Sequence, residues 1–317
     1  MRSGEDVRTL GVVGTGAIGV SWVVLGLEHG LDVVAWDPAE GAEERLRAQV
    51  PAPSVEPRAQ ASVSRPTQSA GALRFAENLE EVGREADLVL ESGPERLEVK
   101  REIFAVLDAA AAPDVLLTSS SSGLMPSTFQ DACTHHPERV LVAHPFNPPH
   151  LVPLVEVVGG SATSAEAVEA ALETLRHLGK RPIHIRREVP GHVANRLQAA
   201  LWREAYHLVD QGIVSVADID TAIADGPGLR WSLLGPFATQ HLSGGPGGLG
   251  HVLEHLGPPM VEWWDDLGHP ELTAGLVEKL VDGVGEELDG TSAEDLVGRR
   301  DQALRRLLEI KTDLGLG

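Results

Sequence analysis

The chain has 317 residues, a formal net charge of -21 at pH 7 and 42% hydrophobic residues. Such an acidic protein repels the phosphates of nucleic acids and of anionic membranes, so we expect neither as a partner. No apolar run reaches the roughly 18 residues that a membrane-spanning helix needs, and the N-terminus has no apolar stretch typical of a secretory signal. Because Cys133 is the single cysteine, no internal disulfide can form, and we expect a cytoplasmic protein.

The first pattern along the chain is strand, helix and strand. An apolar strand at Thr9–Val13 leads into a glycine-rich turn, a helix follows over 18–29, and a second strand covers 32–36. Glycines at GxGxxG spacing allow a tight turn, the close approach of a pyrophosphate, and the packing of helix on strand. The N–H groups at the start of the helix favour a phosphate. The residues of this predicted nucleotide loop are Gly14, Gly16, Ala17, Ile18 and Gly19.

The second strand ends at Asp37, 18 residues after Gly19. A carboxylate at this place hydrogen-bonds the ribose diol of NAD and repels the 2′-phosphate of NADP. The sequence therefore predicts NAD as the cofactor.

Strands and helices continue to alternate as far as residue 188. A helix is plausible over 40–50, and 51–71 is rich in Pro, Ser, Ala and Gln without any hydrophobic period, which indicates a connector. The alternation predicts a Rossmann-type α/β domain with a doubly wound sheet over 1–188. Its remaining strands are expected at 88–90, 115–117, 140–143, 154–158 and 181–185, and its remaining helices at 95–112 and 165–177.

The stretch from Val140 to Val158, VLVAHPFNPPHLVPLVEVV, is the most informative one. Its first strand delivers His144, its second strand carries Glu156, and prolines are expected to keep the segment between them extended. A carboxylate that fixes the Nδ1 proton of a histidine leaves Nε2 free to take a proton from a substrate hydroxyl. The stretch therefore predicts a general base. The alternative is a strand-end histidine and a surface glutamate without such a role.

From Pro190 onward the pattern is helical throughout. An apolar stripe at helical spacing runs from Val193 to Val209, Ser215 and Asp218 resemble a capping box, and further helices are expected near 249–256, 272–284 and 293–308. This predicts an all-α domain over 189–317. An all-α domain of this kind often dimerises, so we expect a homodimer through it.

No metal site is expected. His251 and His255 are four residues apart on a predicted helix, but no third ligand is evident and HExxH is absent. Trp263 and Trp264 are more easily explained by packing in a core or an interface than by a pocket.

Taken together, these motifs resemble the L-3-hydroxyacyl-CoA dehydrogenase family over nearly the whole chain. The motifs are GxGxxG with Asp37, the polar turn TSSSSG at 118–123, HPFNP at 144–148, LVEVV at 154–158 and PGHVANR at 190–196. Within that family, the stretch 142–158 and GLRWSLLGP at 228–236 look most like the branch that contains lambda-crystallin (L-gulonate 3-dehydrogenase) and carnitine dehydrogenase.

The resemblance implies a role for several residues. His144 and Glu156 match the catalytic pair, while Ser122 and Asn195 match an active-site serine and asparagine that contact the substrate. Three further positions match residues that help to seat the cofactor and its nicotinamide end, namely Glu95, Lys100 and Asn147. The implied reaction is hydride transfer between NAD and carbon 3 of a small L-3-hydroxy acid, a substrate of the size of gulonate, carnitine or 3-hydroxybutyrate.

Two departures from the family concern the substrate. Members that act on acyl-CoA carry a lysine-rich helical segment after the second strand, which grips the CoA phosphates, and residues 38–74 contain no lysine. Gly123 and Leu124 follow Ser122, as in the branch that acts on free acids. A short acyl-CoA stays the alternative substrate, and a non-catalytic NAD-binding protein is the alternative of another class.

A free acid needs a cation, because a buried carboxylate without a partner is costly. Arg196 and Arg230 follow directly on site motifs. Arg196 is the neighbour of Asn195 on a helix, where adjacent side chains point about 100° apart. Arg230 lies in GPGLRW at 226–231, which is expected to be a loop. Its planar fork suits a carboxylate, so we expect Arg230 to bind the substrate.

Overall fold

The computed structural model describes residues 1–50 and 71–316, which form two compact units, Met1–Asn195 and Arg196–Gly317. The predicted change from alternating strands and helices to helices alone is confirmed. The connector predicted over 51–71 lies almost wholly outside the described residues. In the part of the chain that the structure describes, no helix is long and apolar enough to cross a membrane.

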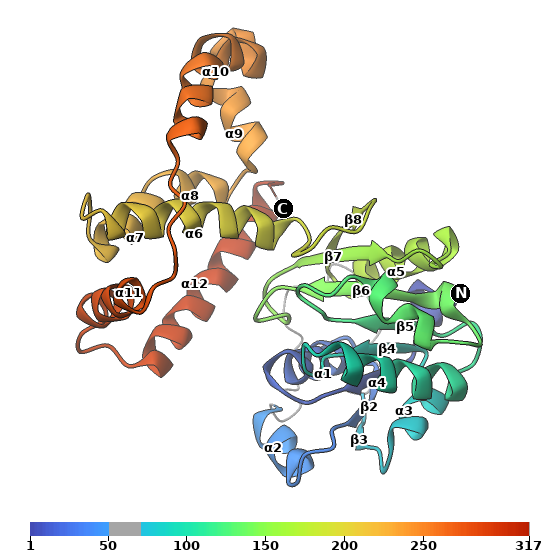
Figure 1. The fold of residues 1–317 in the computed structure, drawn as a ribbon. Helices are drawn as coiled ribbons and strands as arrows, with labels where there is room; N and C mark the ends of the chain where they lie inside the picture. Colours follow the sequence, from blue (N-terminus) through green and yellow to red (C-terminus); the bar gives the residue numbers. More distant parts are fainter. Residues whose placement is uncertain (51–70, 317) are drawn as a thin grey trace. The chain divides into compact units, whose positions relative to one another are not determined.

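The first unit is built on one sheet of eight strands, in the order β3-β2-β1-β4-β5-β6-β7-β8 (Figure 1). The pairs from β3 to β6 are parallel, β7 is antiparallel to β6, and β8 is parallel to β7. The Rossmann-type fold class is therefore confirmed. The strands are β1 Thr9–Val13, β2 Asp32–Trp36, β3 Leu73–Phe75, β4 Leu88–Glu91, β5 Leu116–Ser119, β6 Val140–Pro145, β7 Leu154–Gly159 and β8 Arg181–Ile185.

Five α-helices accompany this sheet in the described residues: α1 Ala17–Glu28, α2 Ala42–Gln49, α3 Leu79–Glu85, α4 Leu97–Ala110 and α5 Ala165–His177. Four short 3-10 helices lie in the same unit, namely η1 Gly4–Asp6, η2 Pro126–Thr128, η3 Gln130–Ala132 and η4 Pro137–Arg139. Strand β3 and helix α3 were missed by the sequence reasoning. Both elements are short, which weakens any periodic pattern in the sequence. Helix α3 follows Asn78, whose side chain caps it by accepting from Glu81 N.

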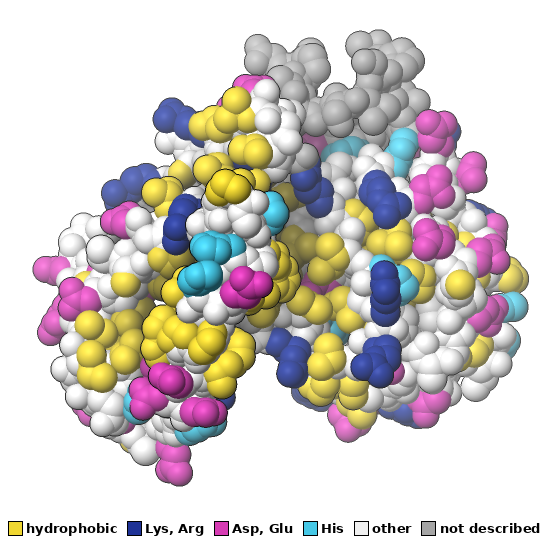
Figure 2. Space-filling view, turned by 90° about the horizontal axis from the view of Figure 1, so that it is seen from above, with side chains coloured by type: hydrophobic (Ala, Val, Ile, Leu, Met, Phe, Trp, Pro, Cys, Tyr) yellow, Lys and Arg dark blue, Asp and Glu magenta, His cyan; other side chains and the backbone are white. Residues whose placement is uncertain are grey.

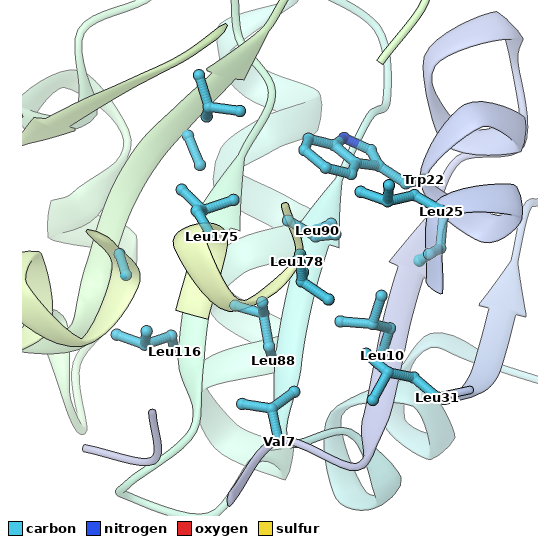
Figure 3. Close-up of a cluster of buried hydrophobic side chains, with 14 of the residues drawn as sticks. Val7, Leu10, Trp22, Leu25, Leu31, Leu88, Leu90, Leu116, Leu175 and Leu178 are labelled. Carbon is cyan, nitrogen blue, oxygen red and sulfur yellow. The ribbon is translucent and has the colours of Figure 1, made fainter. Parts of the chain in front are cut away.

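Alternating side chains of the strands build two separate cores, one on each face of the sheet. Along β6, Leu141 and Ala143 belong to the cluster that contains Trp22, which Figure 3 shows packed among leucines of α1, β1 and β4. Val140 and Val142 belong to the other cluster. Because successive side chains of a strand point to opposite faces, the next even position, His144, lies on the face of the second cluster.

The second unit is helical in all of its described regular structure. Its helices are α6 Ala194–Asp210, which begins in the first unit, α7 Val216–Ala224, α8 Pro227–Trp231, α9 Pro236–Ser243, α10 Gly248–Asp266, α11 Ala274–Glu287 and α12 Ala293–Asp313, with the 3-10 helix η5 Gly245–Gly247. The predicted capping box is confirmed, because Ser215 and Asp218 bond to each other's backbone N–H. The helical domain was predicted to begin at residue 189. In the structure the first compact unit ends at Asn195.

Two local expectations were wrong. Residues 148–152 form a turn instead of an extended segment, since Leu151 N and Val152 N both bond to the carbonyl of Pro148. The loop expected around Arg230 is the short helix α8, which begins at Pro227. Proline suits the first position of a helix, because its fixed φ fits and the N–H that it lacks would have no partner there.

Candidate functional site

His144 and Glu156 lie side by side on paired strands. Their Cα positions are partners in the antiparallel register of β6 and β7, and His144 Nδ1 lies 2.8 Å from Glu156 Oε2. His144 is 4% exposed and Glu156 is fully buried. An ionised carboxylate only accepts hydrogen bonds, so the proton of this contact sits on Nδ1. The other ring nitrogen, Nε2, then carries a lone pair that can take a proton.

Glu156 is also bonded to the start of helix α6. Its Oε1 accepts from the backbone N–H groups of Val193 and Ala194, each at 2.9 Å. Burial by itself raises the pKa of this carboxyl, but the bonds from His144, Ala194 and Val193 outweigh it, and the pKa lies below its usual value. Glu156 is therefore ionised at neutral pH, although it is buried.

The serine turn, Thr118–Gly123, is held by Glu95. Oε1 of Glu95 accepts from the hydroxyl of Ser121 and, at 3.0 Å each, from the N–H groups of Gly123 and Leu124. Burial raises the pKa of Glu95, and these bonds lower it to a value below normal. Glu95 thus shapes the turn that presents the exposed Ser122.

Asn195 joins the serine turn to α6. Its side-chain amide donates to the carbonyl oxygen of Ser122 at 3.1 Å. The neighbouring Ala194 N–H bonds to Glu156, which in turn bonds to His144. The structure thereby brings together the four residues for which a catalytic role was predicted.

Lys100 lies inside the protein, 1% exposed, with Nζ 3.0 and 2.9 Å from the two carboxylate oxygens of Glu91. Glu91 also accepts from Ser119 Oγ at 2.6 Å, and Lys100 Nζ lies 4.0 Å from Glu95. Sequence reasoning missed Glu91. The signal was available, because Glu91 is the first charged residue at the end of an apolar strand. A cofactor role for Lys100 stays a prediction.

The backbone and packing of the glycine-rich loop explain two of its three glycines. Gly14 has φ +86°, which favours glycine, and a Cβ at Gly19 would lie 1.9 Å from the Gly14 carbonyl oxygen. A Cβ at Gly16 would meet no atom within 4 Å. Packing within the described chain therefore does not explain Gly16, and a close-lying phosphate would. Ala17 and Ile18 open α1, whose first N–H groups have no side-chain cap.

Asp37 lies beside this loop. Its Oδ2 accepts from Thr15 N at 2.7 Å and from Thr15 Oγ1 at 3.1 Å, and its Oδ1 accepts from Ala39 N at 2.9 Å. A carboxylate has about four acceptor positions, so capacity for a ribose diol remains. The loop and Asp37 fit the adenosine and pyrophosphate parts of NAD.

Two other predicted residues are exposed. Asn147 follows β6 and precedes the turn at 148–152, and Arg230 lies on α8 in the helical unit. Trp263 and Trp264 on α10 are 59% and 62% exposed, so they are not core residues. Among the described residues, no three His, Cys, Asp or Glu side chains form a group that could hold a metal.

His192 is a second functional candidate that the sequence reasoning did not single out. It lies in the stretch PGHVANR, is fully buried, and its ring centroid is 5.3 Å from that of His144. The available signal was the presence of a histidine among the small and apolar residues of PGHVANR.

Comparisons with known proteins identify the family of the chain. Residues 9–189 match the model of the 3-hydroxyacyl-CoA dehydrogenase NAD-binding domain, and residues 191–278 match that of the C-terminal domain of the same family. The chain belongs to the 3-hydroxyacyl-CoA dehydrogenase family. It is an NAD-dependent dehydrogenase that acts on a CH–OH group, as predicted.

Curated relatives of this dehydrogenase cover almost its whole length. It is 48% identical to an L-carnitine dehydrogenase of Pseudomonas aeruginosa, over 96% of this chain and 94% of the relative. It is 45% identical to an L-carnitine dehydrogenase of Streptomyces coelicolor, over 99% and 98%. A similar solved structure, with TM-score 0.79 and 26% identity over 98% of this chain and 99% of the other, is that of a 5-formyl-3-hydroxy-2-methylpyridine 4-carboxylic acid 5-dehydrogenase.

Proposed function

We propose that this dehydrogenase interconverts a small, free L-3-hydroxy acid and its 3-keto acid, with L-carnitine as the first candidate substrate. The observation that carries the proposal is the buried contact of 2.8 Å between His144 Nδ1 and Glu156 Oε2. It leaves Nε2 of His144 as the base that removes the proton of the substrate hydroxyl. The names of the curated relatives support carnitine.

In this proposal each residue has a separate task. NAD, when bound along the glycine-rich loop, supplies the acceptor for the hydride that leaves carbon 3. His144 takes the hydroxyl proton onto Nε2 and becomes an imidazolium. Glu156, ionised and anchored by two backbone N–H groups, keeps the ring oriented and stabilises its positive charge.

Ser122 and Asn195 are proposed to contact the reacting oxygen. The Ser122 side chain is exposed, and the Asn195 amide uses one donor for the Ser122 carbonyl, so its second N–H remains for a substrate oxygen. Donors fixed before the reaction stabilise the charge that develops on that oxygen. We further propose that Glu95, Lys100 and Asn147 support the nicotinamide end, Glu95 by shaping the serine turn.

The free acid is preferred to a CoA thioester because of the charges that follow β2. Residues 38–74 contain no lysine, and the first turn of α2 carries Glu43 and Glu44. The two arginines of the same helix are already engaged, Arg45 by the Glu40 carbonyl and Arg47 by Glu43, so α2 offers no free cluster of cations to the phosphates of CoA. The relatives named L-carnitine dehydrogenase agree with a free acid.

A screen of NADH formation tests the proposal. The substrates are L-carnitine, L-gulonate, 3-hydroxybutyrate, a 3-hydroxy phosphonate and 3-hydroxybutyryl-CoA, each with NAD at fixed pH. The highest kcat/KM is expected for a free acid. A higher kcat/KM for the thioester would refute the free-acid proposal and support the acyl-CoA alternative. Tight NAD binding without turnover of any substrate would instead support a non-catalytic NAD-binding protein.

We also propose that the protein is a homodimer through its helical unit. Buried apolar side chains in the described part of that unit are few, namely Val209, Val252 and Leu276. Many large ones are exposed, and Figure 2 shows hydrophobic side chains on the surface beside charged ones. Exposed apolar area on this scale is typical of an interface. Light scattering on a sizing column should give twice the chain mass, and a monomer at micromolar concentration would contradict this.

A cytoplasmic location is proposed as well. The one cysteine, Cys133, is buried, and burial raises the pKa of its thiol to about 12. A chain with one cysteine forms no internal disulfide, so its fold does not depend on an oxidising compartment. Cell fractionation of a tagged protein tests this, and recovery from the periplasm or the medium would contradict it.

A further inference from the structure

His192 has an unusual backbone conformation at a sensitive place. Its φ is +52°, the one positive value at a non-glycine residue in the described chain. This left-handed region is uncommon for such residues and marks positions that the surroundings hold in place. The two residues that follow, Val193 and Ala194, give their N–H groups to Glu156. His192 therefore sits at the point where the chain turns to meet the proposed catalytic pair.

The ring of His192 joins this point to the serine turn. Nε2 lies 3.0 Å from the carbonyl oxygen of Ser121. Because a carbonyl oxygen only accepts, Nε2 must carry the ring proton in this contact. Nδ1 is buried and has no hydrogen-bond partner among the described residues. A neutral ring with its proton on Nε2 has a bare lone pair on Nδ1, which costs less than a buried, unpaired N–H⁺.

We propose that His192 is a positioning residue of the dehydrogenase: fixed as the neutral Nε2–H tautomer, it ties the serine turn to the backbone that anchors Glu156 and so fixes Ser122 and His144 relative to each other. This inference rests on the proposed function, because it assigns His192 a task in the same reaction. Ser121, which accepts its bond, is the direct neighbour of Ser122.

The charges around His192 favour the neutral form. Burial lowers the pKa of its imidazole most, the Ser121 bond raises it, and the positive form of His144 lowers it further, while Glu156 and Glu95 raise it; the net shift is downward. The groups that face it are thus His144 from β6, Glu156 from β7 and Glu95 ahead of α4. When His144 holds the substrate proton, a neutral neighbour 5.3 Å away adds no repulsion.

Two substitutions separate positioning from simple packing. His192→Phe keeps a ring but loses the bond to Ser121, and it also removes the unsatisfied Nδ1. We expect kcat to fall by about ten- to a hundredfold, as for small displacements of reacting groups, with KM for NAD nearly unchanged. The thermal midpoint should fall too, because phenylalanine is strained at this positive φ and leaves the Ser121 carbonyl without its bond. His192→Asn tolerates positive φ and offers an amide N–H to Ser121, so it should recover part of kcat. Wild-type kcat in His192→Phe would overturn the proposal.

The pH profile gives an independent test. If His192 stays neutral, the acid side of log kcat/KM should fall with a slope of one, because His144 alone takes up a proton. A slope of two in the wild type that becomes one in His192→Phe would overturn the inference.

Nitrogen-15 NMR of the wild-type holoprotein tests the tautomer without any substrate. The His192 signals are assigned by their loss in His192→Phe, or in His192→Asn if the phenylalanine variant does not fold. A protonated Nε2 and an unprotonated Nδ1 from pH 8 to pH 6 are expected. A proton on Nδ1, or titration near pH 6.5, overturns the proposal. If the substrate screen finds no turnover, the proposed function fails, and the NMR result still decides the state of His192.

Discussion

His144 and Glu156 are direct partners in the antiparallel register of β6 and β7, and their side chains meet on one face of the sheet at 2.8 Å. They are 12 positions apart in sequence. Sheet register fixes their relation more firmly than a contact between loops could. A slip of one residue would move one side chain to the opposite face. The sheet itself therefore prearranges the proposed base and its carboxylate.

The first prediction concerns this pair. His144→Gln should lower kcat by on the order of 10²–10⁴, the usual contribution of a general base, since glutamine cannot take up the hydroxyl proton. Glu156→Gln should lower kcat as well, because the imidazolium loses its support. Steady-state kinetics on the true substrate measures both. NAD affinity and the thermal midpoint of His144→Gln serve as controls, and full turnover by this variant would refute the mechanism.

Much of the sheet could be predicted because most of its strands are short apolar runs bounded by glycine, proline or charged residues. Thr9–Val13 and Asp32–Trp36 have the predicted bounds, and so does the edge strand Arg181–Ile185, although most of its side chains are exposed. Parallel strands are buried on both faces, so continuous apolar runs identify them. The closeness of Glu156 to His144 also followed from two runs joined by a short loop.

Other features depend on contacts that no local pattern reveals. Strand β3 has three residues and pairs with β2 from beyond residue 70, so no periodicity could indicate it. Helix α10 continues through Pro258 and Pro259, although prolines normally end a helix, and the predicted helix ended before them. The bond of His192 to Ser121 joins residues 71 apart. Its existence requires the tertiary fold.

The second prediction concerns cofactor choice. The Asp37 carboxylate should exclude NADP, because it would repel the 2′-phosphate, whereas it can hydrogen-bond the free ribose hydroxyls of NAD. Asp37→Ser should therefore narrow the preference for NAD over NADP, measured as the ratio of kcat/KM values. Gly16→Ala is a useful companion, since its Cβ would meet no protein atom; it should weaken binding of both cofactors equally. A wild-type preference for NADPH would contradict the assignment of Asp37.

The third prediction concerns the stability that the buried pair of Lys100 and Glu91 contributes. Lys100→Met leaves the Glu91 carboxylate buried without its cation, so the free energy of unfolding should fall by about 3–5 kcal/mol. Urea unfolding followed by circular dichroism measures it. Arg47→Met is the matched control, because Arg47 pairs with Glu43 on the surface, where both side chains are 50% exposed. That change should cost at most about 1 kcal/mol. Equal losses in the two variants would show that the buried pair has no special role.

The fourth prediction concerns pH and Lys180. This lysine is 6% exposed, and its ammonium donates to the carbonyl oxygens of Pro149 and Val152. Burial lowers its pKa from 10.5 to about 8, against a smaller opposite effect of Glu28. Between these two pKa values the unfolded chain binds more protons than the folded one, so this group makes stability rise with pH across that window.

Urea unfolding of the wild type and of Lys180→Met at several pH values tests this pH dependence of stability. The wild type should gain stability relative to the variant as pH rises from 8 to 10, because the penalty for a buried charge disappears as Lys180 loses its proton. A constant difference between the two proteins over this range would show that the Lys180 pKa is not lowered in the fold.

The last prediction concerns the acid end of the substrate. Arg230 is exposed on the short helix α8, and its planar guanidinium can bind a carboxylate through two parallel bonds. If it binds the substrate acid out of water, Arg230→Met should raise KM for that acid strongly, by roughly 2–5 kcal/mol in kcat/KM. NAD affinity should stay the same. Arg196→Met is the comparator, because Arg196 is the other arginine that follows a site motif.

The substrate's own charge provides the decisive control for Arg230. An uncharged ester of the same hydroxy acid, or its CoA thioester, has no carboxylate at that end, so Arg230→Met should affect its kcat/KM far less than that of the acid. Equal losses on acid and thioester would mean that Arg230 supports the fold of the helical unit instead. If Arg230→Met leaves kcat/KM unchanged on both substrates while Arg196→Met lowers kcat/KM for the acid strongly, Arg196 is the residue that binds the carboxylate.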